Sequence, residues 1–125
     1  MSEHLDLPKR ARSFLYAARG VRDLVRSQPN ARIHAAATVA VVVLASSLGV
    51  GRTGWALLVL AIASVWCAES LNTALEALCD RASPEYHPLV ERAKDAAAAA
   101  VLLAALGAAA VGFLVLGPPL WAWLG

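Results

Sequence analysis

The sequence predicts an all-α integral membrane protein, in which an amphipathic surface helix precedes three transmembrane helices. Hydrophobic residues make up 59% of the 125 positions and charged residues 16%, against roughly 45–50% and 25% in soluble domains. A domain of this size buries only about two-thirds of its surface, so it cannot hide so much apolar material from water. The net charge of +2 is too small to favour a nucleic-acid-binding protein.

The segment 8–28 is predicted to form a helix that lies in the membrane interface. At about 100° per residue, four of its five arginines fall on one side and a group of apolar residues falls on the opposite side. This pattern is typical of interfacial helices. The alternative is a basic helix packed on a soluble partner. The four arginines are Arg12, Arg19, Arg22 and Arg26, and the apolar residues are Phe14, Ala18, Val21 and Val25.

Three charge-poor segments are predicted to cross the membrane, at 33–51, 53–80 and 88–117. A span needs about 20 apolar residues. The second charge-free run ends at residue 68, but its helical pattern continues without Gly or Pro to Asp80. Pro29 should break the chain before the first span, and Pro88 suits the first position of the last helix. The whole chain, 1–125, is then one membrane domain.

The distribution of positive charge predicts a cytoplasmic N-terminus and an external C-terminus. Residues 1–32 carry seven Lys or Arg and residues 80–95 carry three, whereas the turn after the first span carries only Arg52. Basic loops stay on the cytoplasmic side. The first 30 residues lack the apolar core of a secretory signal, so we expect this end to be retained.

The segment AESLNTALEALCD places a row of polar residues on one face of the second span: Glu69, Asn72, Thr73, Glu76 and Asp80. Glu69 should lie just inside the hydrocarbon boundary, where an uncompensated carboxylate is costly and usually functional. The alternative is a structural ion pair, or a protonated carboxyl bonded to Asn72. A carboxylate can act on a substrate or recruit magnesium with a nucleotide.

A second polar cluster, Lys94 and Asp95, stands at the start of the third span. It should meet the first cluster at the same membrane face, because the connection between the two spans is short. A lysine can hold phosphate oxygens as a compact positive charge. Taken alone, the pair also suits a simple interfacial anchor.

Four ordered motifs resemble the prokaryotic diacylglycerol kinase and undecaprenol kinase family of small membrane enzymes. They are SFLYAARG, NARIH, ESLNTALEALCD and HPLVERAKDAAAAAVLL, between Ser13 and about Val101. No Walker loop or protein-kinase signature is present in the sequence. The resemblance implies an ATP-dependent lipid kinase of the bacterial inner membrane, a homotrimer with active sites between protomers.

The resemblance also implies roles for individual residues. Glu69 would be the general base, Glu76 would bind Mg²⁺, and Asn72 would hold the reacting groups, with Asp80 in support. Lys94 and Asp95 would contact ATP together with Glu76. Weaker matches add Tyr16, Glu85 and His87 to the nucleotide site; their alternatives are an interfacial aromatic, a solvated acid and a helix cap.

Gln28 departs from the family pattern, which usually has a metal-binding glutamate at this position. An amide oxygen can coordinate Mg²⁺ but brings no charge. The predicted reaction is transfer of the γ-phosphoryl group of Mg-ATP to a membrane lipid alcohol, with undecaprenol favoured over diacylglycerol from NTALE and HPLVERAKDAAAAAV. The competing interpretations are a non-catalytic transport or assembly subunit with Glu69 in a proton path, and an inactive lipid-binding family member.

Overall fold

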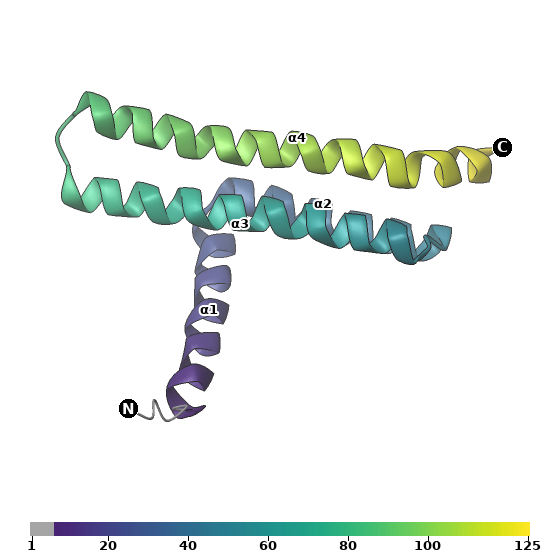
Figure 1. Cartoon of the computed structure of the whole chain (residues 1–125), viewed down its shortest axis with the longest axis horizontal. Helices are drawn as coiled ribbons and strands as arrows, with labels where there is room; N and C mark the ends of the chain where they lie inside the picture. The colour runs from purple at the N-terminus through teal and green to yellow at the C-terminus, as the bar shows by residue number, and fades with distance from the viewer. Residues whose placement is uncertain (1–6) are drawn as a thin grey trace, which may run out of the picture.

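The computed structural model describes residues 7–125, which form four helices and no strand (Figure 1). These are α1 (Leu7–Ser27), α2 (Pro29–Leu48), α3 (Arg52–Ala82) and α4 (Pro88–Leu124). The last three are long and apolar enough to cross a membrane. The predicted all-helical class and the three spans are therefore confirmed. The predicted domain also includes residues 1–6, which lie outside the described part of the chain.

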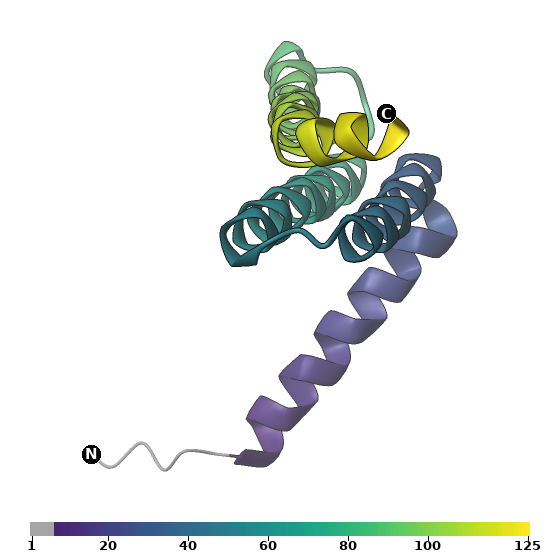
Figure 2. The ribbon, with the colours of Figure 1, turned by 90° about the vertical axis from the view of Figure 1, so that its right-hand side faces the viewer.

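The junction between α1 and α2 is a single extended residue, Gln28, followed by Pro29 as the first residue of α2. The guanidinium of Arg32 reaches back from α2 and donates to the carbonyl oxygens of Val25 and Arg26. These are end carbonyls of α1, which lack partners within their own helix. These hydrogen bonds allow the charged Arg32 side chain to lie within α2. The helix therefore begins before the expected position 33. α1 runs across the direction of the other helices and projects away from them (Figure 2).

α2 ends at Leu48 rather than at the expected residue 51. Gly49 takes a left-handed conformation with φ of 67°, which glycine adopts without a steric penalty. The N–H of Val50 then donates to the carbonyl of Ala45 at 3.2 Å. The turn is consequently tight, and α3 starts at Arg52.

The helix bundle is held together by small residues and a compact apolar cluster. α3 and α4 run side by side in opposite directions (Figures 1 and 2). Ala45, Leu58 and Leu116 bring one buried side chain from each span into contact. Gly54 lies so close to Val50 and Val115 that a Cβ atom there would meet both side chains. Close approach of this kind is how membrane helices gain packing energy.

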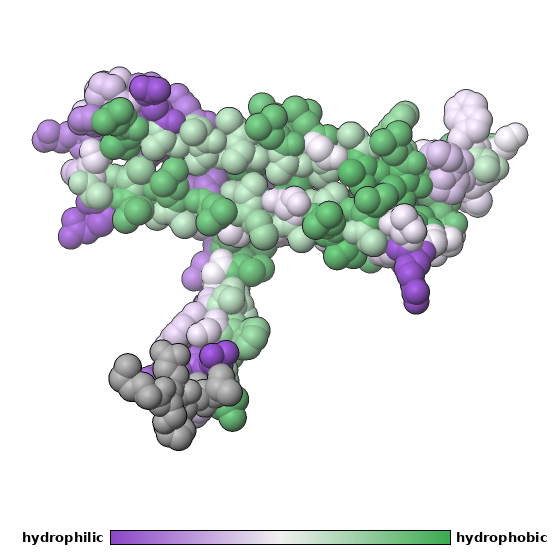
Figure 3. All heavy atoms as spheres, viewed as in Figure 1, coloured by the Kyte–Doolittle hydropathy of each residue, from purple (hydrophilic) through white to green (hydrophobic). Residues whose placement is uncertain are grey.

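Large apolar side chains cover the outside of the bundle (Figure 3). Phe113, Leu114 and Leu103 are about three-quarters exposed, an arrangement suited to lipid and not to water. Hydrophilic residues gather on α1 and at the end of the bundle where α3 connects to α4 (Figure 3).

α4 continues through Pro118 and Pro119 to Leu124, past the expected end at residue 117. Each proline removes one backbone hydrogen bond and normally clashes with the residue before it. Gly117 precedes Pro118 and has no Cβ, which reduces the clash at the first of the two prolines. Trp121 and Trp123 lie on this last part of α4, and both side chains are exposed.

Candidate active site

The polar face predicted for α3 points into the protein from Glu69 to Glu76, whereas Asp80 at its end is exposed. Glu69 is buried with 2% of its side chain exposed, and Asn72, Thr73 and Glu76 are half-buried. The apolar neighbours Leu71 and Leu78 are exposed instead, at 71% and 65%. A carboxylate held inside a membrane protein in this way marks a functional position by general experience.

His34, on α2, faces this carboxylate. Its Nε2 atom lies 3.5 Å from Oε2 of Glu69, and 17% of its side chain is exposed. His34 belongs to the motif NARIH but was not among the predicted site residues. The sequence signal that could have indicated His34 is its position as a titratable residue inside an otherwise uncharged span. Its partner, Glu69, lies 35 positions away in the chain.

Several buried polar atoms in this region have no hydrogen-bond partner. They are His34 Nε2, Glu69 Oε2, Asn72 Oδ1 and Thr73 Oγ1. Such atoms in an apolar medium cost free energy unless something satisfies them. The amide nitrogen of Asn72 does have a partner, because Nδ2 donates to Glu76 Oε1 at 3.4 Å. The cluster thus offers unused donors and acceptors to a polar group brought by a ligand.

A second polar region lies where α3 ends and α4 begins. Lys94 Nζ donates to Asp80 Oδ1 at 2.6 Å. The pair borders a pocket of about 420 Å³, within the roughly 300–1,000 Å³ typical of small-molecule sites. The predicted residues that line it are Asp80, Glu85, His87, Lys94 and Asp95.

The loop between α3 and α4 is braced by its own side chains. His87 caps α4, because its Nδ1 accepts a hydrogen bond from the N–H of Leu89 at 3.1 Å. This favours the capping interpretation of His87 over a primary role in nucleotide contact. The hydroxyl of Tyr86 donates to Glu91 at 2.7 Å, and this bond raises the pKa of Tyr86, with a smaller contribution from burial.

Glu69, Asn72 and Glu76 lie earlier on α3 and do not line this pocket, and two further predicted residues lie outside α3 and α4 altogether. Tyr16 lies on α1, exposed to 60%, with the guanidinium of Arg19 over its ring at 5.8 Å. Gln28 is the half-buried junction residue between α1 and α2. Neither lines the pocket bordered by Lys94 and Asp80. Tyr16 can therefore reach the pocket only if α1 moves, or if α1 of another copy of the chain supplies the residue.

The oxygen donors of the polar face of α3 are suited to a magnesium ion that arrives with a nucleotide. Within residues 7–125, no group of three or more His, Cys, Asp or Glu side chains could hold a metal ion by itself. Magnesium, however, is usually bound by one or two carboxylates, waters and substrate phosphates. The half-buried Glu76 carboxylate, oriented by Asn72, is a suitable donor of this kind.

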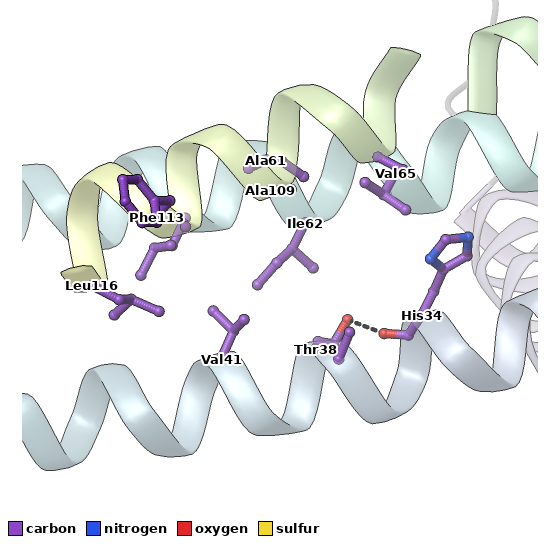
Figure 4. A pocket seen from close by; sticks show the side chains of 14 residues that line it. His34, Thr38, Val41, Ala61, Ile62, Val65, Ala109, Phe113 and Leu116 are labelled. Carbon is purple, nitrogen blue, oxygen red and sulfur yellow. Dashed lines mark hydrogen bonds between the residues drawn. The ribbon is translucent and has the colours of Figure 1, made fainter. Parts of the chain in front are cut away.

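An apolar groove runs from His34 along the three spans (Figure 4). Its volume is about 420 Å³, and Thr38 of α2, Ile62 of α3 and Phe113 of α4 are among its lining residues. His34 stands at one end of the groove in this view. The buried carboxylate therefore lies next to an apolar channel between the helices.

Comparison with known proteins identifies relatives over most of the chain. Residues 15–116 match the family model described as prokaryotic diacylglycerol kinase. The undecaprenol kinase of Bacillus subtilis is 36% identical over 87% of this chain and 89% of its own length. The diacylglycerol kinase of Synechocystis is 46% identical over 86% of this chain, which covers 62% of that enzyme.

The diacylglycerol kinase of Escherichia coli K12 is 38% identical over 71% of this chain and 73% of its own. The matched region of the family model includes α2, α3, most of α4, and the polar residues of α3 and α4. With the buried carboxylate on α3 and the charged pocket beside it, these matches identify the chain as a lipid kinase of the prokaryotic diacylglycerol kinase family.

Proposed function

We propose that this lipid kinase transfers the γ-phosphoryl group of Mg-ATP to the hydroxyl of a membrane lipid alcohol, with Glu69 as the general base. The observation that carries the proposal is the state of Glu69. Its carboxylate is 2% exposed, on a membrane-spanning helix, and its Oε2 has no hydrogen-bond partner. A lipid hydroxyl at this depth would give the carboxylate a proton to accept.

The reaction balances without any covalent enzyme intermediate. The lipid oxygen forms a new bond to the γ-phosphorus, and the bond between that phosphorus and the β–γ bridging oxygen breaks. The hydroxyl proton passes to Glu69, ADP leaves, and the proton is later released to water. Phosphoryl transfer depends mainly on positioning and on neutralising charge, so a fixed base beside the lipid is sufficient on the acceptor side.

The nucleotide would be held at the junction of α3 and α4. Lys94 and Asp95 line the pocket there, and Glu85 and His87 border it. Magnesium, when bound with ATP, would neutralise phosphate charge; Glu76 would hold it, with Asn72 orienting the carboxylate and Gln28 as a further oxygen donor. Asp80 would support Lys94, to which it is already bonded.

Undecaprenol is the proposed acceptor, in preference to diacylglycerol. The motifs NTALE and HPLVERAKDAAAAAV support this choice, as does the match to the undecaprenol kinase of Bacillus subtilis over 89% of its length. The higher identity to the diacylglycerol kinase of Synechocystis supports the alternative acceptor. The two lipids must therefore be compared directly.

The test is transfer of radiolabelled γ-phosphate from ATP to each lipid in nanodiscs that contain the purified protein. We expect product from undecaprenol at a higher kcat/KM than from diacylglycerol. Glu69→Gln should fold and lose nearly all transfer, because an amide cannot accept the proton. Ser70→Ala, one residue away on the exposed side of α3, is the matched control. Normal turnover by folded Glu69→Gln would remove the base assignment.

The protein is proposed to reside in the bacterial inner membrane with its N-terminus in the cytoplasm. Seven basic residues before Ile33 and three in 80–95 support this orientation. In a variant without its native cysteines, a cysteine at Gly125 should react with an impermeant reagent in intact cells, and one at Pro84 should not. The reverse labelling pattern would invert the topology.

A homotrimer is the proposed assembly. A three-span protomer leaves Asn72, Thr73 and Glu76 only half-buried, and a neighbouring copy would shield them from lipid. The pocket also sets four carboxylates against one ammonium, so extra positive charge from a neighbouring copy would favour a nucleotide. Native mass spectrometry from nanodiscs should detect three copies; a fully active monomer would contradict the assembly.

A further inference from the structure

The contact between His34 and Glu69 joins two different spans inside the bundle. Nε2 of His34 and Oε2 of Glu69 lie 3.5 Å apart. Both atoms are buried, and neither has a complete hydrogen bond. Among residues 7–125, His34 is the basic side chain that approaches this carboxylate. A shift of a few tenths of an ångström, with reorientation of the ring, would turn the contact into a hydrogen bond.

A complete hydrogen bond joins α2 and α3 beside this contact. Next to it, one turn along each helix, Trp66 Nε1 donates to Thr38 Oγ1 at 3.0 Å. The Thr38 hydroxyl in turn donates to the carbonyl of His34 at 2.7 Å (Figure 4). That second polar contact is fully formed and already fastens the two helices. The incomplete contact at His34 therefore has the character of a functional pair.

The chemistry of the pair is specific. A neutral imidazole that carries its proton on Nε2 can donate to a carboxylate without becoming charged. One donated hydrogen bond restricts the rotation of the carboxyl group and directs its remaining lone pairs elsewhere. A general base must hold its accepting oxygen within hydrogen-bond reach of the proton it takes. A misplacement of about 1 Å can cost about a hundredfold in rate.

We propose that His34 is the positioning residue for Glu69: its Nε2–H donates to Oε2 and holds the carboxylate in the orientation that accepts the lipid proton. The inference rests on the proposed role of Glu69 as the base. His34 touches the base, and it acts on the reaction through that contact. Because the effect is on orientation, it should change kcat and leave the KM values for ATP and lipid nearly constant.

The test compares amides of two lengths at position 34. The amide nitrogen of glutamine can occupy the place of Nε2, whereas that of asparagine is too short to reach Glu69. We expect His34→Gln to keep kcat within about threefold of the native enzyme. His34→Asn and His34→Leu should lower it by roughly tenfold to a hundredfold, with each KM within about twofold. His34→Asn keeps the comparison possible if His34→Leu does not fold.

Trp66→Phe is the matched control. It removes the neighbouring hydrogen bond between α2 and α3 from the α3 side and leaves both His34 and the Thr38 hydroxyl in place, so it should lower thermal stability with little change in kcat. Circular dichroism and thermal unfolding check the packing of each variant.

Three outcomes would overturn the role of His34: an unchanged kcat in folded His34→Leu or His34→Asn, a change confined to KM, or a His34→Gln as slow as His34→Asn. The last result would mean that the ring must carry protons and not merely donate a bond. Glu69→Gln in the same assay separates the two proposals. If it is active, the base assignment fails; if it is inactive beside a fully active His34→Leu, only the positioning role fails.

Discussion

Lys94 and Asp80 form a 2.6 Å hydrogen-bonded ion pair that joins the start of α4 to the end of α3. Their side chains are 38% and 68% exposed, so solvent screens the pair and it contributes little to stability. The bond does, however, set where the ammonium lies beside the pocket. Its main consequence should be for anion binding.

Replacement of Lys94 should therefore weaken nucleotide binding far more than it weakens the fold. A hydrogen bond to a charged partner is worth roughly 1.5–3 kcal/mol, so Lys94→Met should raise the KM for ATP about tenfold to a hundredfold. Asp80→Asn retains a polar partner for the lysine and should change this KM only a few-fold. Steady-state kinetics at saturating lipid measures both. Equal effects of the two variants would mean that Lys94 acts through the pair and does not contact ATP.

Restoring a carboxylate at position 28 should lower the magnesium requirement. An amide at Gln28 brings no charge to a hard cation, whereas a glutamate would. We expect Gln28→Glu to reduce the free Mg²⁺ that gives half-maximal activity, and Glu76→Gln to raise it sharply or abolish activity. Magnesium is titrated at fixed saturating ATP. An unmoved curve for Gln28→Glu would show that position 28 does not face the metal.

A methyl group at Gly54 should destabilise the bundle. A Cβ atom there would overlap Val50 Cγ1 and lie 3.1 Å from Val115 Cγ1 on α4. Overpacking of this kind typically costs about 1–3 kcal/mol, so Gly54→Ala should unfold at a lower temperature in detergent. Gly107→Ala is the control, because a methyl group added there would meet nothing within 4 Å. Equal melting temperatures for the two variants would contradict the close packing at Gly54.

Tyr86 should titrate at a higher pH than a free tyrosine. The hydrogen bond to Glu91 favours the protonated phenol and raises the pKa of Tyr86 above 10.0. The stabilisation that this hydrogen bond provides is therefore fully present below pH 10. It is lost as the pH rises through the raised pKa of Tyr86. Ultraviolet absorbance of Tyr16→Phe reports Tyr86 alone, since the chain has two tyrosines. Glu91→Gln should lower this pKa, and Glu85→Gln, in the same loop, should leave it unchanged.

The family and the order of the helices were predictable because they depend on local patterns. The apolar runs identified the three spans, Pro29 identified the break after α1, and Pro88 identified the start of α4. Helix ends were less accurate. The expected end at residue 117, just before two prolines, was wrong, because α4 continues through both prolines to Leu124.

One part of the candidate site was likewise predictable from the sequence, and another part was not. The spacing of Glu69, Asn72 and Glu76 predicted one polar face, and their burial confirms it. The roles assigned to these residues, and to Gln28 and Tyr16, remain predictions. Helical periodicity describes one helix at a time, so it could not indicate which side chain of another span would meet that face.

The sequence by itself determined the membrane setting, the three spans and the inward polar face of α3, because hydropathy and the helical repeat act over neighbouring residues. Only the tertiary structure decided the contacts between segments distant in the chain. It brought His34 to Glu69, turned Arg32 back onto the end of α1, and joined Lys94 to Asp80. Those contacts depend on how the helices pack and on their register, which arise from many small surfaces fitting together at once.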